Sequence, residues 1–115
     1  MQIRYKNTKV ERQFSSKYKK TWTYPRQVQI KLEAAENFIK DAASLMDILN
    51  YPPFHFEKLK GDRKDEWSIR LGNTGYRVTM YPCDDSGNKI IGGDIVALCK
   101  QIEIVLVTEV SNHYE

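Results

Sequence analysis

Two alternating segments on either side of a glycine-rich turn constrain the fold of this chain more than any other feature. Residues 67–71 and 76–80 each alternate apolar with polar side chains, and Gly72-Asn73-Thr74-Gly75 lies between them. A period of two is typical of half-buried strands, and glycine and asparagine favour turns. The segment therefore predicts an antiparallel β-hairpin with one apolar face and one polar face.

The length of the turn decides which side chains face each other across this hairpin. If Leu71 pairs with Tyr76 across a four-residue loop, Arg70 lies opposite Arg77 on the polar face. Like charges in that position are unfavourable by roughly 0.2–1 kcal/mol. They are tolerated when both side chains reach solvent, or when the face binds a phosphate, which guanidinium groups grip in bidentate fashion. A three-residue loop with a glycine bulge at Gly75 would separate the two arginines instead.

The first half of the chain follows a helical period. Gln2 to Tyr5 can form a strand and Thr8 to Ser15 a short helix. From Pro25, apolar residues recur at the spacing of an amphipathic helix. The apolar stripe consists of Val28, Leu32, Ala35 and Ile39, and Arg26, Lys31 and Glu36 fall outside it. Asp41 can cap a further short helix to about Leu49, which Tyr51-Pro52-Pro53 terminates.

The last third of the chain supplies a loop and another strand. Asp84 to Asp94 is rich in glycine and aspartate and predicts a long loop. Ile102 to Val107 is nearly continuous in apolar residues, which is typical of a central strand covered on both faces. Helices first and strands afterward favour an α+β fold, with the N-terminal helices packed on one face of a mainly antiparallel, twisted β-sheet.

Length and composition indicate one ordinary globular domain over residues 1–115. We expect a cytoplasmic protein, because no segment resembles a signal peptide or a membrane span. Cys83 and Cys99 are far apart and have no histidines at metal-ligand spacing, so we expect neither a metal site nor redox chemistry. The net charge of +3 permits an RNA or phosphate partner without requiring one.

Candidate binding residues cluster just before the hairpin. Lys60, Arg63 and Lys64 surround a Gly-Asp turn, with Glu57 before them and Trp67 after them. Such a cluster could bind single-stranded RNA through phosphate contacts and stacking. The alternative is structural: the charged residues would be solvated, and Trp67, which is in phase with Ile69 and Leu71, would belong to the core.

The two histidines differ in position. His55 lies between two phenylalanines beside the proline turn, where a structural role is expected. His113 lies two residues before the last residue of the sequence, Glu115, and its imidazole could act as a general acid or base.

The block LKGDRKDEWSIRLGNTGYRV resembles the central block of HigB-type toxins of the RelE/ParE superfamily, in particular their longer "killer" branch. The opening IRYKNTKVERQF, the QIKLEAAEN helix and the terminal IEIVLVTEVSNHY are similar to the rest of the family in order and type. The resemblance implies a RelE-like fold and a toxin of a type II toxin–antitoxin system. Such a toxin cleaves mRNA on the translating ribosome, needs no metal or other cofactor, and is neutralised by a helix-turn-helix, HigA-like antitoxin.

The resemblance also implies roles for individual residues. Lys60 and Arg77 match phosphate-contacting and transition-state-stabilising positions, and Arg63 matches a basic residue of the same motif. Glu57 falls where relatives have His or Glu, and His113 matches a terminal histidine. The usual Asp-Tyr-His ending is replaced here by Ser111-Asn112-His113.

These assignments suggest a reaction in which the ribose 2′-OH attacks the adjacent phosphate. Arg77 and Lys60 would stabilise the developing charge, and either Glu57 or His113 would be the base and the other the acid. The remaining RNA contacts would come from Arg63, Lys64, Trp67 and Arg70. Two alternatives stay open: a ParE-like protein that binds DNA gyrase, and a degenerate toxin that only binds its antitoxin or nucleic acid.

Overall fold

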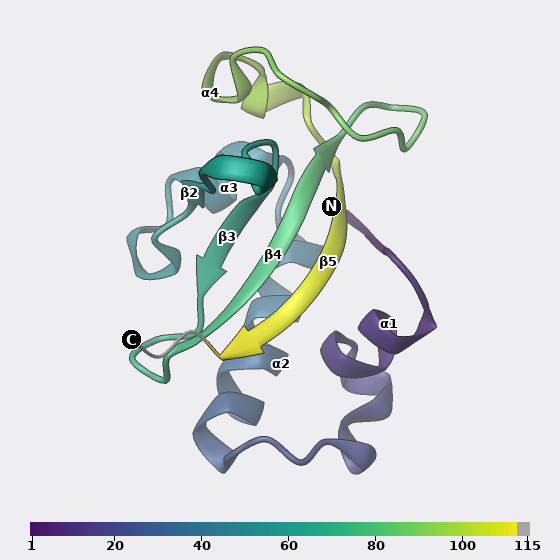
Figure 1. Cartoon of the computed structure of the whole chain (residues 1–115), viewed down its shortest axis with the longest axis vertical. Coiled ribbons are helices and arrows are strands. Elements are labelled where there is room, and N and C mark those ends of the chain that lie inside the picture. The colour runs from purple at the N-terminus through teal and green to yellow at the C-terminus, as the bar shows by residue number, and fades with distance from the viewer. Residues whose placement is uncertain (113–115) are drawn as a thin grey trace.

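The computed structural model describes residues 1–112, in which one strand and a run of helices precede most of the strands (Figure 1). The strands are β1 (Gln2–Tyr5), β2 (Glu57–Lys58), β3 (Trp67–Arg70), β4 (Tyr76–Cys83) and β5 (Ile104–Asn112). The α-helices are α1 (Thr8–Phe14), α2 (Arg26–Asp41), α3 (Leu45–Leu49) and α4 (Ile95–Leu98). Short 3-10 helices are η1 (Ser16–Thr21), η2 (Pro52–Phe54), η3 (Gly61–Arg63) and η4 (Cys99–Gln101).

The strands of the described chain form one mixed sheet in the order β1-β5-β4-β3-β2. β1 runs parallel to β5, and the other neighbouring strands are antiparallel. The predicted α+β class is confirmed, and β5 is an interior strand between β1 and β4, whereas β4 is the central strand of the sheet. β5 begins at Ile104 and continues to Asn112, five residues beyond the predicted end. The extra residues include exposed and half-exposed polar side chains, so this half of β5 is not covered on both faces.

The hairpin has the predicted register. Arg70 pairs with Arg77, and the Leu71 amide donates to the Tyr76 carbonyl at 3.0 Å across the four-residue turn. Gly72 and Gly75 adopt φ values of 59° and 83°, a region that residues with a Cβ rarely enter. Two glycines in these places allow the tight reversal, so the bulged three-residue alternative does not occur.

Helices α1, α2 and α3 supply apolar residues to a core that also contains the inward side chains of β3, β4 and β5. Figure 1 shows α2 behind the sheet, and we call the opposite side of the sheet the open face. The predicted stripe Val28, Leu32, Ala35 and Ile39 is buried as expected. The expectation for Glu36 is wrong: it is 0% exposed, accepts from the Ser16 amide at 3.1 Å and pairs with Lys40 at 3.3 Å. The carboxylate thus fixes the start of η1, a contact that helical periodicity cannot reveal.

The predicted cap of the next helix is also wrong. Asp41 is the last residue of α2, and Ser44 caps α3 by accepting from the Met46 amide at 3.3 Å. The chain leaves the helical conformation at Ala42, and the Met1 ammonium group donates to the Ala42 carbonyl at 2.6 Å. The Met1 ammonium group also donates to the Ile39 and Lys40 carbonyls, so residues far apart in sequence satisfy the C-terminal end of α2.

The polar face of the hairpin is more buried than alternation predicts. Ser68 and Thr79 are 0% and 1% exposed, although their side chains point away from the apolar core. Arg63, which follows β2, donates to the Thr79 hydroxyl at 3.1 Å, so the η3 turn covers this part of the open face. The prediction of two half-buried strands holds only for their ends near the turn.

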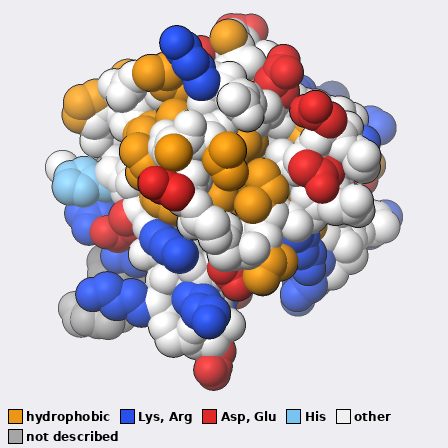
Figure 2. Space-filling model, turned by 90° about the horizontal axis from the view of Figure 1, so that it is seen from above, with side chains coloured by type: hydrophobic (Ala, Val, Ile, Leu, Met, Phe, Trp, Pro, Cys, Tyr) orange, Lys and Arg blue, Asp and Glu red, His pale blue; other side chains and the backbone are white. Residues whose placement is uncertain are grey.

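The segment after β4 contains structure that the glycine-rich composition does not predict. The expected loop over residues 84–94 is followed by α4 and η4, and Ile91, Val96 and Leu98 of this segment are exposed. Figure 2 views this end of the molecule and shows hydrophobic side chains gathered among charged ones. Cys83 and Cys99 are buried free thiols. Within residues 1–112, no helix is long and apolar enough to cross a bilayer.

Candidate nucleic-acid interface

Arg70 and Arg77 lie side by side near the end of the hairpin, as the sequence predicts. Together with Gly72, Asn73, Gly75 and Tyr76 they line a shallow pocket of about 300 Å³, which we call the arginine pocket. β5 continues this row, because Ser111 pairs with Arg77 from the other side. The arginine pocket thus combines two guanidinium groups with the backbone of a turn, a composition suited to an anion.

Glu57 joins this site from the edge strand. Its carboxylate lies 3.8 Å from Arg70 Nη2, and the two side chains are 47% and 43% exposed. The opposite charge offsets part of the repulsion between Arg70 and Arg77, although an exposed pair contributes little to stability. The structure therefore brings the predicted residues Glu57, Arg70 and Arg77 together.

Two polar atoms in the same row lack an internal partner. Arg70 Nε and Ser111 Oγ are inaccessible to solvent and have no hydrogen-bond partner among the described residues. Leaving such a group unpaired costs about 1–3 kcal/mol. Because neither atom is accessible, the two do not by themselves indicate a ligand, and the suitability of the pocket for an anion depends on its two guanidinium groups.

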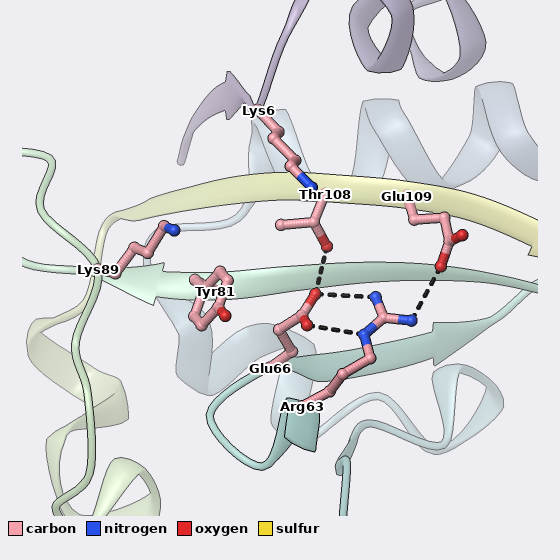
Figure 3. A pocket seen from close by; sticks show the side chains of 7 residues that line it. All are labelled: Lys6, Arg63, Glu66, Tyr81, Lys89, Thr108 and Glu109. Carbon is pink, nitrogen blue, oxygen red and sulfur yellow. Dashed lines mark hydrogen bonds and ion pairs between the residues drawn. The ribbon is translucent and has the colours of Figure 1, made fainter. Parts of the chain in front are cut away.

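Arg63 has a different environment from the one predicted. Its Nε and Nη2 donate to the two carboxylate oxygens of Glu66 at 2.8 and 2.9 Å, and Nη1 donates to Glu109 at 3.0 Å (Figure 3). Thr108 also donates to Glu66, at 2.6 Å. We call Arg63, Glu66, Thr79, Thr108 and Glu109 the Arg63 network. Four of the five N–H donors of the Arg63 guanidinium group bind internal acceptors, so the main role that the structure gives Arg63 is to anchor η3 to the sheet.

The electrostatics of the network agree with this role. Hydrogen bonds to Glu66 raise the pKa of Arg63, and hydrogen bonds from Arg63 lower the pKa of Glu66 against the opposing effect of burial. Both groups are thus held in their charged forms. The Arg-x-x-Glu spacing was the one sequence feature that could have indicated the Arg63–Glu66 ion pair. Thr79, Thr108 and Glu109 come from distant strands, so the sequence gives no sign of their contacts.

The other predicted basic residues stay on the surface. Lys60 precedes η3 and Lys64 follows it, and both are exposed. They lie at the β2 edge of the sheet, whereas Arg77 lies on β4 beyond β3. The structure therefore sets Lys60 and Lys64 on the rim of the open face and not in the row of Arg70 and Arg77.

Trp67 is a core residue. It is 8% exposed, and its indole stacks on Phe56 with ring centroids 4.7 Å apart. The structural interpretation of Trp67 is confirmed, and this ring offers no free face to a nucleobase. His113 lies outside the described residues. The described strand β5 ends at Asn112, which pairs with Tyr76 of the arginine pocket.

A second hollow on the open face lies over the Arg63 network. Lys6, Tyr81 and Lys89 complete this pocket of about 250 Å³, and Lys89 Nζ lies 4.7 Å from the centre of the Tyr81 ring (Figure 3). The carboxylates of Glu66 and Glu109 also line it, so it is less suited to a phosphate than the arginine pocket.

No protein-family model matches this chain, and a search of the curated proteins finds no match. Within residues 1–112, no group of three or more His, Cys, Asp and Glu side chains is arranged to hold a metal ion. The features of this chain that bear on function are therefore the geometry of the arginine pocket and the resemblance of the central block.

Proposed function

We propose that this protein is a toxin of a type II toxin–antitoxin system with a RelE-like fold, and that it cleaves mRNA on the translating ribosome. The observation that carries the proposal is the Arg70–Arg77 pair, which lines a pocket on the open face with Glu57 beside it. Two adjacent guanidinium groups with a neighbouring carboxylate match the needs of phosphate chemistry, which are positive charge and a proton acceptor.

The proposed reaction uses the nucleophile that RNA itself carries. A base removes the proton of the ribose 2′-OH, the oxygen bonds to the adjacent phosphorus, and the bond to the 5′-oxygen breaks as an acid protonates that oxygen. The products are a 2′,3′-cyclic phosphate and a 5′-hydroxyl. Arg77 stabilises the charge that develops on the phosphate oxygens, and Glu57 or His113 acts as the base with the other as the acid.

The positions of the other side chains on the open face suggest the remaining contacts with RNA. Arg70 binds a neighbouring phosphate, and Lys60 and Lys64 contribute positive charge at the rim, through which the RNA enters. Arg63 and Trp67 support the site from within the fold and leave the RNA contacts to the other side chains. A helix-turn-helix antitoxin that covers the open face would neutralise the toxin by excluding the RNA.

Primer-extension mapping of a defined messenger in a bacterial translation reaction tests this function. Wild type should produce ribosome-dependent cuts, and Arg77→Ala should lose them. Removing a single preorganised charge contact to the transition state lowers a rate by about 10²–10³-fold in comparable sites. Lys100→Ala serves as the control, because Lys100 is exposed on η4 at the far end of the sheet.

Each result leads to a definite conclusion. Cuts that vanish in Arg77→Ala and persist in Lys100→Ala support the nuclease and its site. Intact RNA with folded wild type contradicts the proposal. Gyrase-dependent DNA breaks in bacteria that express the protein would then point to a ParE-like action, and normal growth of those bacteria with tight antitoxin binding would point to a degenerate toxin.

A further inference from the structure

Positive charge is concentrated in one part of the chain. Residues 6–26 contain seven lysines and arginines and the single acidic residue Glu11, whereas the whole chain has a net charge of +3. This segment forms α1, η1 and the approach to α2. Because the rest of the chain is net acidic, the α1 side of the molecule is where a polyanion would be attracted.

A recess lies within this basic segment. It has a volume of about 420 Å³ and is lined by one side of α1 and by residues 21–24. Lys9 and Arg12 of α1 contribute two exposed cations, and the described residues that line the recess include no carboxylate. We call it the α1 recess. Its lining contrasts with the pocket over the Arg63 network, where Glu66 and Glu109 oppose an anion.

Hydrogen bonds hold the walls of the α1 recess in place. The Trp22 indole donates to the Arg12 carbonyl at 2.9 Å, and the Tyr24 hydroxyl donates to the Gln13 carbonyl at 3.0 Å. Both bonds connect residues 22–24 to the end of α1. The two aromatic rings are therefore fixed beside the cations before any ligand binds, which reduces the entropy lost on binding.

Aromatic rings connect the α1 recess to the arginine pocket. The centroids of Trp22 and Tyr24 are 5.9 Å apart, and those of Tyr24 and Tyr76 are 5.7 Å apart. Tyr76 is itself part of the arginine pocket. All three side chains are partly exposed. Trp22, Tyr24 and Tyr76, which we call the aromatic series, lie on the helix side of the sheet and lead from the two-cation recess to the hairpin turn, where Tyr76 meets the arginine pocket.

We propose that the α1 recess is a second binding subsite for single-stranded RNA, occupied by the nucleotides next to those in the arginine pocket. Phosphates contact Lys9 and Arg12, and unpaired bases pack against the aromatic series. Sites that bind single strands combine a positive groove with stacking platforms in this way, whereas a paired duplex has no free base faces to offer. The inference depends on the proposed function, because it takes the substrate of the arginine pocket to be RNA.

Binding of RNA oligonucleotides to the complete chain, without ribosomes, tests the subsite. The probes are a fluorescent trinucleotide and a fluorescent dodecanucleotide, both 2′-O-methylated so that they cannot be cleaved, and the readout is anisotropy over a range of salt concentrations. The variants are Lys9→Gln and Arg12→Gln, with Lys100→Gln as a control that removes the same charge elsewhere. Thermal unfolding of each variant confirms that it is folded.

We expect Lys9→Gln and Arg12→Gln to weaken dodecanucleotide binding and to leave trinucleotide binding unchanged. Each lost phosphate contact should reduce the slope of log K against log salt by about 0.7, the value for a single-stranded nucleic acid. Trp22 should report binding through a change in its fluorescence, since the other tryptophan, Trp67, is buried. Trp22→Phe should lose that signal.

Three results would overturn the subsite. Equal dodecanucleotide affinities and equal salt slopes for Lys9→Gln, Arg12→Gln and Lys100→Gln would show that the recess does not touch RNA. If Arg77→Ala still weakened binding in that case, the nuclease proposal would stand without the subsite. Absence of dodecanucleotide binding by wild type would also refute the subsite. The primer-extension experiment would then test the nuclease proposal separately. Binding of a duplex of the same length as tightly as the single strand would refute the stacking role.

Discussion

Replacing Arg63 with glutamine tests whether this residue anchors the η3 turn or binds RNA. The substitution removes two hydrogen bonds from Glu66, whose side chain is 8% exposed, and leaves that carboxylate with the Thr108 hydroxyl. Breaking a fully buried ion pair costs about 3–5 kcal/mol. Arg63 is 39% exposed, so water replaces part of the interaction and the expected loss is about 2 kcal/mol. That loss lowers the melting temperature by roughly 8 °C for a chain of this size.

The loss should depend on pH. Arg63 lowers the pKa of Glu66 in the folded protein below its unfolded value, so the pair stabilises the fold above that value. As the pH falls from the unfolded pKa of a glutamate, about 4.3, through the lower pKa of Glu66 in the folded protein, the carboxylate becomes protonated and this contribution disappears. The difference in unfolding free energy between wild type and Arg63→Gln should therefore be largest near neutral pH and should shrink in acid.

Urea denaturation followed by circular dichroism at neutral and acidic pH measures both effects. Lys64→Gln is the control, because Lys64 is exposed in the same turn and its loss should change stability by no more than about 0.5 kcal/mol. The reasoning is refuted if Arg63→Gln is as stable as wild type at neutral pH, or if its deficit persists unchanged in acid. A folded Arg63→Gln that has lost RNA affinity would restore Arg63 as a phosphate contact.

Three further changes probe other parts of the fold. Trp67→Leu should destabilise the protein by about 1–3 kcal/mol, because packing on Phe56 is lost, and denaturation would measure this loss. The RNA affinity of the folded fraction should stay unchanged in the anisotropy assay. Gly75→Ala should cost about 1–2 kcal/mol, because Gly75 has a φ of 83°, whereas Asn73→Ala in the same turn should change the unfolding free energy little. Burial raises the pKa of the Cys83 thiol, so iodoacetamide should label Cys83 slowly in the native protein and rapidly in urea, with the ratio measured by mass spectrometry.

Local patterns predicted the elements that frame the candidate site. Period-two alternation identified β3 and β4, and turn chemistry identified the register that sets Arg70 against Arg77. Helical periodicity identified α2 with its buried stripe. These predictions succeed because strand register and helical phase depend on neighbours that lie within a few residues of each other.

Predictions failed where a side chain's partners come from distant segments. Glu36 is charged and lies beside an apolar stripe, yet its side chain is buried and accepts a hydrogen bond from the Ser16 amide. Arg63 lies in a basic motif, yet besides the nearby Glu66 it donates to Thr79 of β4 and Glu109 of β5, which the local sequence does not reveal. From the sequence alone, a basic residue that can bind a ligand cannot be told from one whose donors bind acceptors on a distant strand.

The amino-acid sequence by itself determined the hairpin, its arginine pair and the helical stripe, since these follow from short-range spacing and from the conformations that glycine allows. Only the tertiary structure decided which cations are available to a ligand. It paired Arg63 with Glu66 and Glu109, and it left Arg70 and Arg77 lining an open pocket. It also brought Tyr24 against Tyr76 beside that pocket. The physical reason is that charge and aromatic side chains become a site only through their three-dimensional neighbours, and those neighbours belong to strands and helices that are remote along the chain.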